Sequence, residues 1–261
     1  MSMDSSSKPT ISVAMCTFNG ERFVRQQLES ILSQGMAPLE IVISDDGSSD
    51  GTVRILREVV ARAEADVSLA GVSCRIILND GPHGVAANFQ HAISACSGDV
   101  IALSDQDDVW APGRLKTLVE HLQQNGDLML LHSDARMVDE SGTPLGYSLF
   151  EAISLLETER AQIHGGRGFE ALLRRNLVTG ATTVIRSSLV QIAFPIPAGW
   201  LHDEWLAIVA GAIARFDLVE VKSMDYRQHG SNQIGQLKPT LGYRVRRLLE
   251  PRSFRNDRLL A

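Results

Sequence analysis

The chain of 261 residues has few cysteines and no long hydrophobic segment. Its three cysteines, Cys16, Cys74 and Cys96, are far apart and show no Cys-x-x-Cys spacing, so neither a zinc site nor a disulfide framework is indicated. The longest apolar stretch, Trp205 to Ala214, is too short to span a bilayer. The polar residues 1–10 lack the apolar core of a signal peptide. These absences favour a protein of the reducing cytoplasm.

Charge excludes a further class of function. The net charge of −6 argues against general nucleic-acid binding. Basic residues concentrate at the C-terminus, where segment 236–261 carries seven Lys or Arg against two acidic residues. Leu241, Val245, Leu248 and Leu249 fall on one face if this segment is helical. We expect a basic amphipathic tail that contacts the inner membrane surface peripherally, or one that packs on the body or is disordered.

Strand and helix patterns alternate in the first half of the chain. Predicted strands cover Ile11–Phe18, Ile41–Ser44, Arg75–Asn79 and Asp99–Ser104. Predicted helices cover Glu21–Gln34, Val53–Val60, Gly84–Cys96 and Pro112–Gln124. This rhythm predicts an α/β fold with a mixed, mainly parallel sheet flanked by helices and joined by right-handed crossovers.

The second half is less regular. We predict strands over Leu128–Val138, Val178–Arg186 and Leu218–Tyr226, and helices over Gly168–Arg175 and His202–Ala214. The region from residue 139 to 159 gives no clear pattern. Because neither an internal repeat nor a linker is evident, we expect one domain over residues 10–235, after a disordered N-terminus, residues 1–9.

Three carboxylates follow the predicted strand that ends at Ser104. Asp105 and Asp107 are two residues apart, so in an extended segment both face one site, where their repulsion calls for a cation. Oxygen ligands of this kind suit Mg²⁺ or Mn²⁺ with a bound phosphate. The alternative is that Asp107 or Asp108 caps the helix that begins near Pro112.

A second acidic turn follows the strand Ile41–Ser44. Asp45 and Asp46 lie at the carboxyl end of this strand, where open α/β sheets bind ligands, and an Asp there can accept hydrogen bonds from a base or a ribose. The alternative is structural, with Asp50 as a helix N-cap and Gly47 and Gly51 as ordinary turn residues.

Six motifs in this order resemble family 2 glycosyltransferases with the GT-A fold. They are Thr17-Phe18-Asn19-Gly20, Ser44-Asp45-Asp46-Gly47-Ser48, Ser104-Asp105-Gln106-Asp107-Asp108-Val109-Trp110, Asn176-Leu177-Val178-Thr179-Gly180, His202-Asp203-Glu204-Trp205 and Tyr226-Arg227-Gln228-His229-Gly230. The resemblance covers roughly residues 10–235 and is strongest to bacterial rhamnosyltransferase-like enzymes of surface polysaccharide synthesis. It implies a nucleoside-diphosphate-sugar donor, either dTDP-rhamnose or a UDP-sugar, and a saccharide or lipid-linked saccharide acceptor.

The resemblance also implies residue roles. Asp107 and His229 would bind Mg²⁺ or Mn²⁺, and Asp203 would be the general base. The nucleotide sugar would be bound by Thr17, Phe18, Asn19, Glu21, Asp45, Asp46, Asn88, Asp105 and Gln106. The acceptor would be bound by Thr179, Gly180, Glu204 and Trp205. The chain departs from the family at Ala86-Ala87-Asn88, where many members carry Ala-Arg-Asn, so that phosphate neutralisation would depend more on the metal.

The chemistry of glycosyl transfer suits these residue types. A leaving diphosphate is stabilised by a Lewis acid, and the attacking acceptor hydroxyl needs a placed carboxylate to take its proton. Asp203 opens the predicted helix His202–Ala214, so it is either that base or an acid stabilising the helix N-terminus. We therefore expect a metal-dependent inverting glycosyltransferase. The alternatives are a sugar-nucleotide pyrophosphorylase, for which the expected Gly-rich basic loop is missing after the first strand, and a non-catalytic nucleotide-sugar-binding protein.

Overall fold

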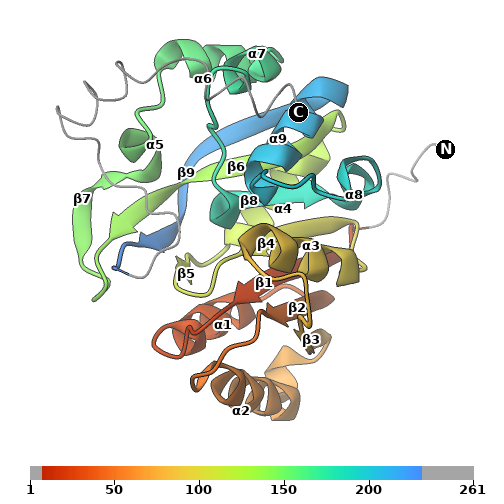
Figure 1. Cartoon of the computed structure of the whole chain (residues 1–261), viewed down its shortest axis with the longest axis vertical. Helices are drawn as coiled ribbons and strands as arrows, with labels where there is room; N and C mark the ends of the chain where they lie inside the picture. Colours follow the sequence, from red (N-terminus) through yellow and green to blue (C-terminus); the bar gives the residue numbers. More distant parts are fainter. Residues whose placement is uncertain (1–7, 231–261) are drawn as a thin grey trace.

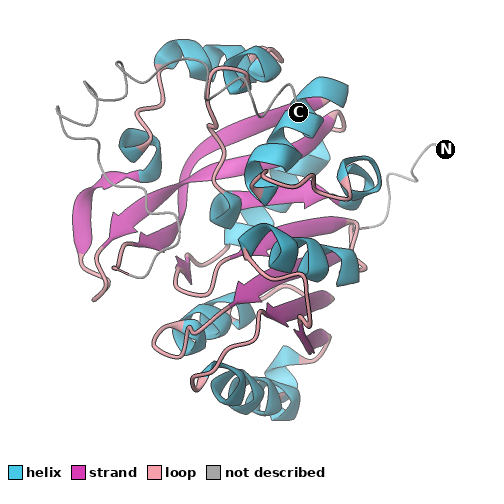
Figure 2. Ribbon diagram, viewed as in Figure 1, coloured by secondary structure: helices cyan, strands magenta, loops and turns pink. Residues whose placement is uncertain are grey.

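The computed structural model describes residues 8–230, whose strands form one sheet (Figures 1 and 2). The strand order is β3-β2-β1-β4-β8-β6-β9-β5, and β7 pairs with β6. Their bounds are β1 (Ile11–Thr17), β2 (Leu39–Asp45), β3 (Val72–Leu78), β4 (Val100–Ser104), β5 (Val109–Trp110), β6 (Leu128–Val138), β7 (Pro144–Ser148), β8 (Thr183–Arg186) and β9 (Arg215–Arg227). The basic tail, residues 236–261, and residues 1–7 of the predicted disordered segment lie outside the described residues.

Helices cover both faces of this sheet. The α-helices are α1 (Val24–Leu32), α2 (Thr52–Ala65), α3 (Val85–Ala95), α4 (Arg114–Gln124), α5 (Leu149–Ala152), α6 (Glu157–His164), α7 (Gly168–Leu172), α8 (Ser187–Ala193) and α9 (His202–Ile213). Two short 3₁₀ turns are η1 (Val67–Leu69) and η2 (Gly180–Thr182). Apolar residues of α1, α2 and α4 form one core cluster, and those of α3, α6, α7, α8 and α9 form the other.

Strand β1 shows why two cores form. Val13 and Met15 contribute to the core under α1, whereas Ala14 and Cys16 contribute to the core under α3. Successive side chains of a strand point to opposite faces, so a strand covered on both sides is apolar throughout. The near-continuous apolar runs of β1, β2 and β4 place these strands in the middle of the sheet.

The predicted α/β class is confirmed, and the two halves of the sheet differ. Strands β3, β2, β1 and β4 are all parallel, as the alternating pattern predicts. Beyond β4, the β8 pairings with β4 and β6 are antiparallel, while β6 and β9 are parallel. The parallel part therefore brings the carboxyl ends of β1, β2 and β4 to one edge, where the loops that follow them meet.

Most predicted elements are present with ends that differ by a few residues in either direction, and a few predictions were wrong. The predicted strand Val178–Arg186 is a 3₁₀ turn, η2, followed by the short β8. The predicted helix Gly168–Arg175 ends at Leu172. The region without a clear pattern contains β7, α5 and the start of α6, and α8 was not predicted. Within residues 8–230, no helix combines the length and the apolar character needed to cross a membrane.

Candidate active site

A cleft of about 740 Å³ opens at the edge where the parallel strands end. One wall is formed by the loops after β1, β2 and β4 together with the residues after β9, and the other by η2 and the start of α9. Most predicted site residues line it: Thr17, Phe18, Asn19, Glu21, Asp46, Asn88, Asp105, Gln106, Asp107, Thr179, Gly180, Asp203 and His229. Three predicted residues, Asp45, Glu204 and Trp205, are not part of the lining. Tertiary structure thus brings together motifs that are far apart in the sequence.

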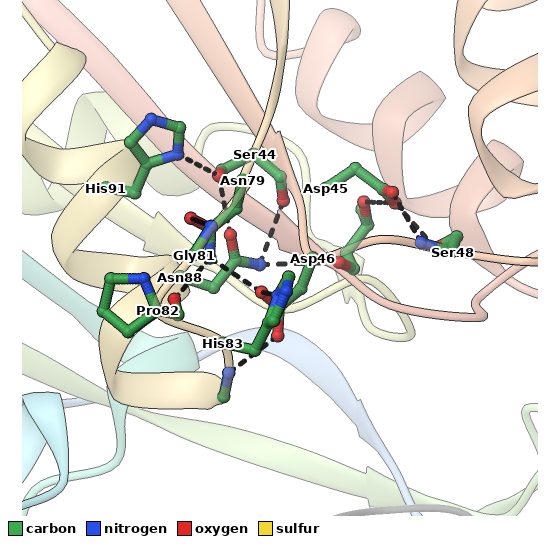
Figure 3. Close-up of polar contacts among 12 residues, drawn as sticks. Ser44, Asp45, Asp46, Ser48, Asn79, Gly81, Pro82, His83, Asn88 and His91 are labelled. Atoms are coloured by element: carbon green, nitrogen blue, oxygen red, sulfur yellow. Dashed lines mark hydrogen bonds and ion pairs between the residues drawn. The ribbon is translucent and has the colours of Figure 1, made fainter.

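The two acids that follow β2 have different surroundings (Figure 3). Asp45 is buried, and its Oδ2 accepts hydrogen bonds from Thr17 Oγ1 at 2.7 Å and Ser48 Oγ at 2.6 Å. Its Oδ1 accepts a third hydrogen bond from the backbone N–H of Ser48 at 2.8 Å. Asp45 therefore joins β1 to the turn after β2, and the structure leaves Asp46 as the acid of this pair that lines the cleft.

Asp46 links the turn after β2 to the loop before α3 (Figure 3). Its Oδ1 accepts a hydrogen bond from Asn79 Nδ2 at 2.7 Å and lies 2.9 Å from His83 Nδ1. Its Oδ2 accepts one from the N–H of Gly84 at 2.8 Å. Asn88 lies behind this loop, where its side chain exchanges hydrogen bonds with Ser44. These hydrogen bonds fix the turn after β2 and the loop before α3 relative to each other.

The loop from β1 to α1 is tied down by side chains from three other segments. Four successive backbone N–H groups each donate to a side-chain oxygen: Phe18 to Gln106 Oε1 at 2.8 Å, Asn19 to Ser48 Oγ at 2.8 Å, Gly20 to Thr52 Oγ1 at 2.7 Å, and Glu21 to Asp50 Oδ2 at 3.1 Å. A Cβ atom at Gly20 would lie 2.2 Å from Gln106 Oε1, so only glycine allows this approach. Asp50 also accepts from Thr52 N–H, which supports its structural role at the start of α2.

The acids after β4 bring carboxyl groups close together in and behind the cleft. Burial, and then the carboxylates of Asp107 and Asp203, raise the pKa of Asp105 to about 8. Asp108 is buried behind this loop and accepts a hydrogen bond from the N–H of Arg227 at 3.1 Å. The alternative role of Asp107 or Asp108 as a helix cap was wrong, because β5 intervenes and α4 begins after Gly113 with no side-chain cap.

His229 lies against Asp107, with 2.9 Å between its Nε2 and Asp107 Oδ2. The two side chains are 7% and 14% exposed. The His229 ring stacks on Phe23 at 4.7 Å between centroids, while Arg227 donates from Nε to the backbone oxygen of Asp107 at 2.7 Å. The end of β9 and the loop after β4 are about 120 residues apart in the sequence, and these contacts pack them directly against each other.

The donor set at this point fits a divalent cation that also binds phosphate. Among residues 8–230, no group of three His, Cys, Asp or Glu side chains is arranged to hold a metal by itself. Mg²⁺ is commonly held by one or two carboxylates together with substrate phosphates and water. Asp107 and His229 supply one oxygen and one nitrogen facing the cleft, which leaves positions for a diphosphate.

Asp203 lies in the first turn of α9 on the opposite wall. Its Oδ2 accepts a hydrogen bond from the N–H of Gly180 at 3.0 Å, and its Oδ1 accepts one from the N–H of Glu204 at 2.7 Å. Burial raises the pKa of Asp203 to about 6, although these backbone N–H groups favour the charged form. A carboxylate in this state is ionised at neutral pH and takes up a proton more readily than an exposed Asp.

The other predicted acceptor residues separate into two groups. Thr179 and Gly180 line the cleft, and a Cβ atom at Gly180 would lie 2.5 Å from His202 Nε2. Trp205 points away, since its Nε1 donates to the backbone oxygen of Ala193 at 2.6 Å. Glu204 is also outside the lining. Trp205 therefore fastens α9 to α8, which corrects its expected placement at the acceptor.

Several residues that line the cleft were given no role from the sequence. His202 is buried and stacks on Phe89 at 3.8 Å between ring centroids. Arg22 and Glu140 form an ion pair within the lining. His202 is adjacent to Asp203, which was a usable signal. Phe89 reads as an ordinary core position of α3, and Glu140 lies in the turn between β6 and β7. For these two residues the sequence carried no signal.

Comparison with known proteins identifies the class of fold. TarS of S. aureus, in complex with UDP-GlcNAc, has a TM-score of 0.60 at 17% identity and covers 95% of this chain and 69% of its own. A mannosyltransferase from Pyrobaculum calidifontis, in complex with GDP-Man and Mn²⁺, also has a TM-score of 0.60 at 17% identity, covering 88% and 60%. Identity this low shows the fold alone, which is the GT-A fold of glycosyltransferases.

Sequence comparison identifies the family. The model of glycosyl transferase family 2 matches residues 12–179, so the chain belongs to this family. EpsE, a proposed glycosyltransferase of Bacillus subtilis, is 34% identical over 136 residues, covering 52% of this chain and 46% of EpsE. An uncharacterised glycosyltransferase of Nostoc sp. is 30% identical over 233 residues, covering 85% and 66%. The chain spans about half to two thirds of the length of these relatives.

Proposed function

We propose that the protein is a metal-dependent inverting glycosyltransferase. It transfers a sugar from a nucleoside-diphosphate sugar to a hydroxyl of a saccharide or a lipid-linked saccharide. The observation that supports this most strongly is the position of Asp203, a partly buried carboxylate that shares one cleft with Asp105, Asp107 and His229. One wall thus holds side chains that could bind a metal and a diphosphate, and the other holds a carboxylate that could accept a proton.

On the donor wall, Asp107 and His229 would bind Mg²⁺ or Mn²⁺. The bound cation would supply Lewis-acid stabilisation of the leaving diphosphate. Asp46 would accept a hydrogen bond from the base, since a carboxylate oxygen can accept more than one hydrogen bond and its Oδ2 accepts one from the N–H of Gly84. Gln106 holds the loop after β1 by pairing its amide with both backbone groups of Phe18. With the base and the diphosphate bound in this way, the sugar would lie between the two walls of the cleft.

On the acceptor wall, Asp203 would act as the general base. Its Oδ2 is oriented by the N–H of Gly180, and its pKa of about 6 leaves it ionised at neutral pH. It would take the proton of the acceptor hydroxyl as the oxygen attacks the anomeric carbon from the side opposite the diphosphate. Attack from that side inverts the configuration of the anomeric carbon.

For the substrates, we propose dTDP-rhamnose or a UDP-sugar as the donor and a saccharide or lipid-linked saccharide of cell-surface polysaccharide synthesis as the acceptor. TarS was solved with UDP-GlcNAc and the Pyrobaculum mannosyltransferase with GDP-Man and Mn²⁺, so GT-A structures of this kind accept different nucleotides. We propose the cytoplasm as the compartment, with peripheral contact to the membrane through the basic tail. Co-sedimentation with anionic vesicles by the full chain, lost in a chain that ends at Gly235, tests that contact.

A thermal-shift panel of UDP, dTDP, GDP and CDP, each with and without Mn²⁺ or Mg²⁺, tests the donor site. Because a ligand that binds the native state raises the melting temperature, the proposal expects stabilisation by uridine or thymidine diphosphate that requires the metal. Stabilisation by none of the four nucleotides, with or without metal, would contradict the proposed function.

A further inference from the structure

The cleft is unusually acidic for a site that would bind a diphosphate. Among the described residues, seven carboxylates line it: Glu21, Asp46, Asp50, Asp105, Asp107, Glu140 and Asp203. The described lining contains one Lys or Arg side chain, that of Arg22. A diphosphate entering such a cleft is repelled unless cations neutralise it. A divalent metal at Asp107 and His229 would supply part of the positive charge. Arg22 is the one Lys or Arg residue of the described lining.

Backbone donors cannot take the place of a cation here. In many nucleotide sites, successive N–H groups after the first strand point at the phosphates. In this chain the N–H groups of residues 18–21 are all used by the side chains of Gln106, Ser48, Thr52 and Asp50. A phosphate could bind them only by breaking these hydrogen bonds. The loop after β1 therefore leaves the phosphates to other donors, of which the side chain of Arg22 carries a positive charge.

Arg22 is close to the proposed metal site. Its guanidinium lies 5.0 Å from the centroid of the Phe23 ring, which also stacks on His229 at 4.7 Å and contacts the Arg227 guanidinium at 4.9 Å. His229 in turn contacts Asp107. Arg22 is thus connected through Phe23 to His229, one of the residues that would hold the metal, and its long side chain could turn toward a diphosphate bound there.

The present partner of Arg22 is one that can be exchanged. Its Nη1 lies 3.0 Å from Glu140 Oε2, and the two side chains are 62% and 55% exposed. Exposed ion pairs contribute little to stability, because solvent screens them and the long side chains lose freedom. A diphosphate carries more charge than one carboxylate and offers oxygens that match the planar guanidinium.

We propose that Arg22 is a binding residue for the diphosphate of the donor, and that it leaves Glu140 for this ligand when the donor enters. Glu140 then competes with the phosphates for the same guanidinium and weakens donor binding. This inference rests on the proposed function, because it requires a nucleoside diphosphate in the cleft.

Titration calorimetry tests the proposed role of Arg22. The variants Arg22→Gln and Glu140→Gln are titrated with UDP and dTDP in the presence of Mn²⁺, and with the nucleosides uridine and thymidine. Arg22→Gln should weaken the diphosphates about tenfold, the range for a charge-assisted hydrogen bond, and leave the nucleosides unchanged. Glu140→Gln should tighten the diphosphates about twofold to threefold, and the double variant should behave like Arg22→Gln. The matched control is Arg25→Gln, since Arg25 forms a similar pair with Glu58 outside the cleft.

Diphosphate affinity of Arg22→Gln within twofold of the unmodified chain overturns the inference and leaves the proposed function standing. An equal loss for nucleosides and diphosphates also overturns it, since Arg22 would then act on the base or on the loop. Failure of the unmodified chain to bind any nucleoside diphosphate is a different result, which contradicts the proposed function itself.

Discussion

The two walls of the cleft are built in different ways. The donor wall consists of short loops that follow parallel strands, and its acids are held by many hydrogen bonds, as Asp45 is by Thr17 and Ser48. The acceptor wall consists of η2 and the start of α9, and Asp203 is held there by two backbone N–H groups. The donor wall is thus a rigid binding surface, whereas the acceptor wall presents one carboxylate with a raised pKa. Substitutions on the two walls should therefore affect different kinetic steps.

The largest effect is expected for Asp203→Asn. Removing a general base lowers transfer by about 10²–10⁴-fold, while donor and metal affinity should stay nearly unchanged because the base acts on the acceptor. Transfer rate, nucleotide affinity and melting temperature are measured on the same variant. Glu204→Gln is the matched control, because Glu204 is adjacent but outside the cleft lining. Normal transfer by Asp203→Asn together with a large loss in Glu204→Gln would assign the base to the other acid.

Asp107→Ala should lower the metal-dependent affinity for the donor, which Asp203→Asn should leave nearly unchanged. It removes one of the two proposed metal ligands, so Mn²⁺-dependent affinity for a nucleoside diphosphate should fall about 100-fold, and transfer should fall with it. Titration calorimetry with and without Mn²⁺ measures this. Asp80→Ala, an exposed acid outside the cleft lining, is the control and should change neither quantity. Unchanged metal-dependent affinity in Asp107→Ala would place the cation elsewhere.

Gly180→Ala should disturb the acceptor wall without touching the donor wall. The added Cβ atom would lie 2.5 Å from His202 Nε2 and 3.5 Å from Asp203 Cβ, so the start of α9 has to shift. A displacement of a catalytic group by a fraction of an ångström to one ångström lowers kcat by about 10-fold to 100-fold. Gly126→Ala is the control, since nothing lies within 4 Å of its added Cβ. If kcat is unchanged and donor affinity falls, the division into two walls is wrong.

The pH dependence gives the smallest effect. Because the pKa of Asp203 is about 6, the ionised fraction falls about tenfold at pH 5, and transfer should fall with it. The raised pKa also means that the folded state favours the protonated acid, so its contribution to stability is present below pH 4 and lost as the pH rises through 6. Asp203→Asn should then be at least as stable as the unmodified chain at pH 8. A rate independent of pH between 5 and 7 would contradict this assignment.

Elements with a clear apolar period were predicted well on both walls of the cleft, α9 to within one residue. β6 has the bounds predicted for it, and β1, β2, β4, α3 and α4 agree with prediction to within about three residues, because each carries a clear apolar period and ends at turn residues. η2 was predicted as part of a strand, since Thr and Val favour strands locally. There the buried Arg114 donates to the backbone oxygen of Ala181, a tertiary contact that outweighs local preference.

The parallel half of the fold, the family and the acids at the ends of β2 and β4 can be predicted from the residues alone, because local periodicity and contiguous motifs carry that information. Which of these acids reach the cleft depends on contacts between distant segments. Asp45 turns inward to Thr17 while Asp46 faces the opening, and Trp205 packs under α8 while Asp203 meets Gly180. Arg22 and Glu140, which are 118 positions apart, form a pair at the same opening. The physical reason is that hydrogen bonds and charges act over a few ångströms in space, and chain folding alone sets those separations.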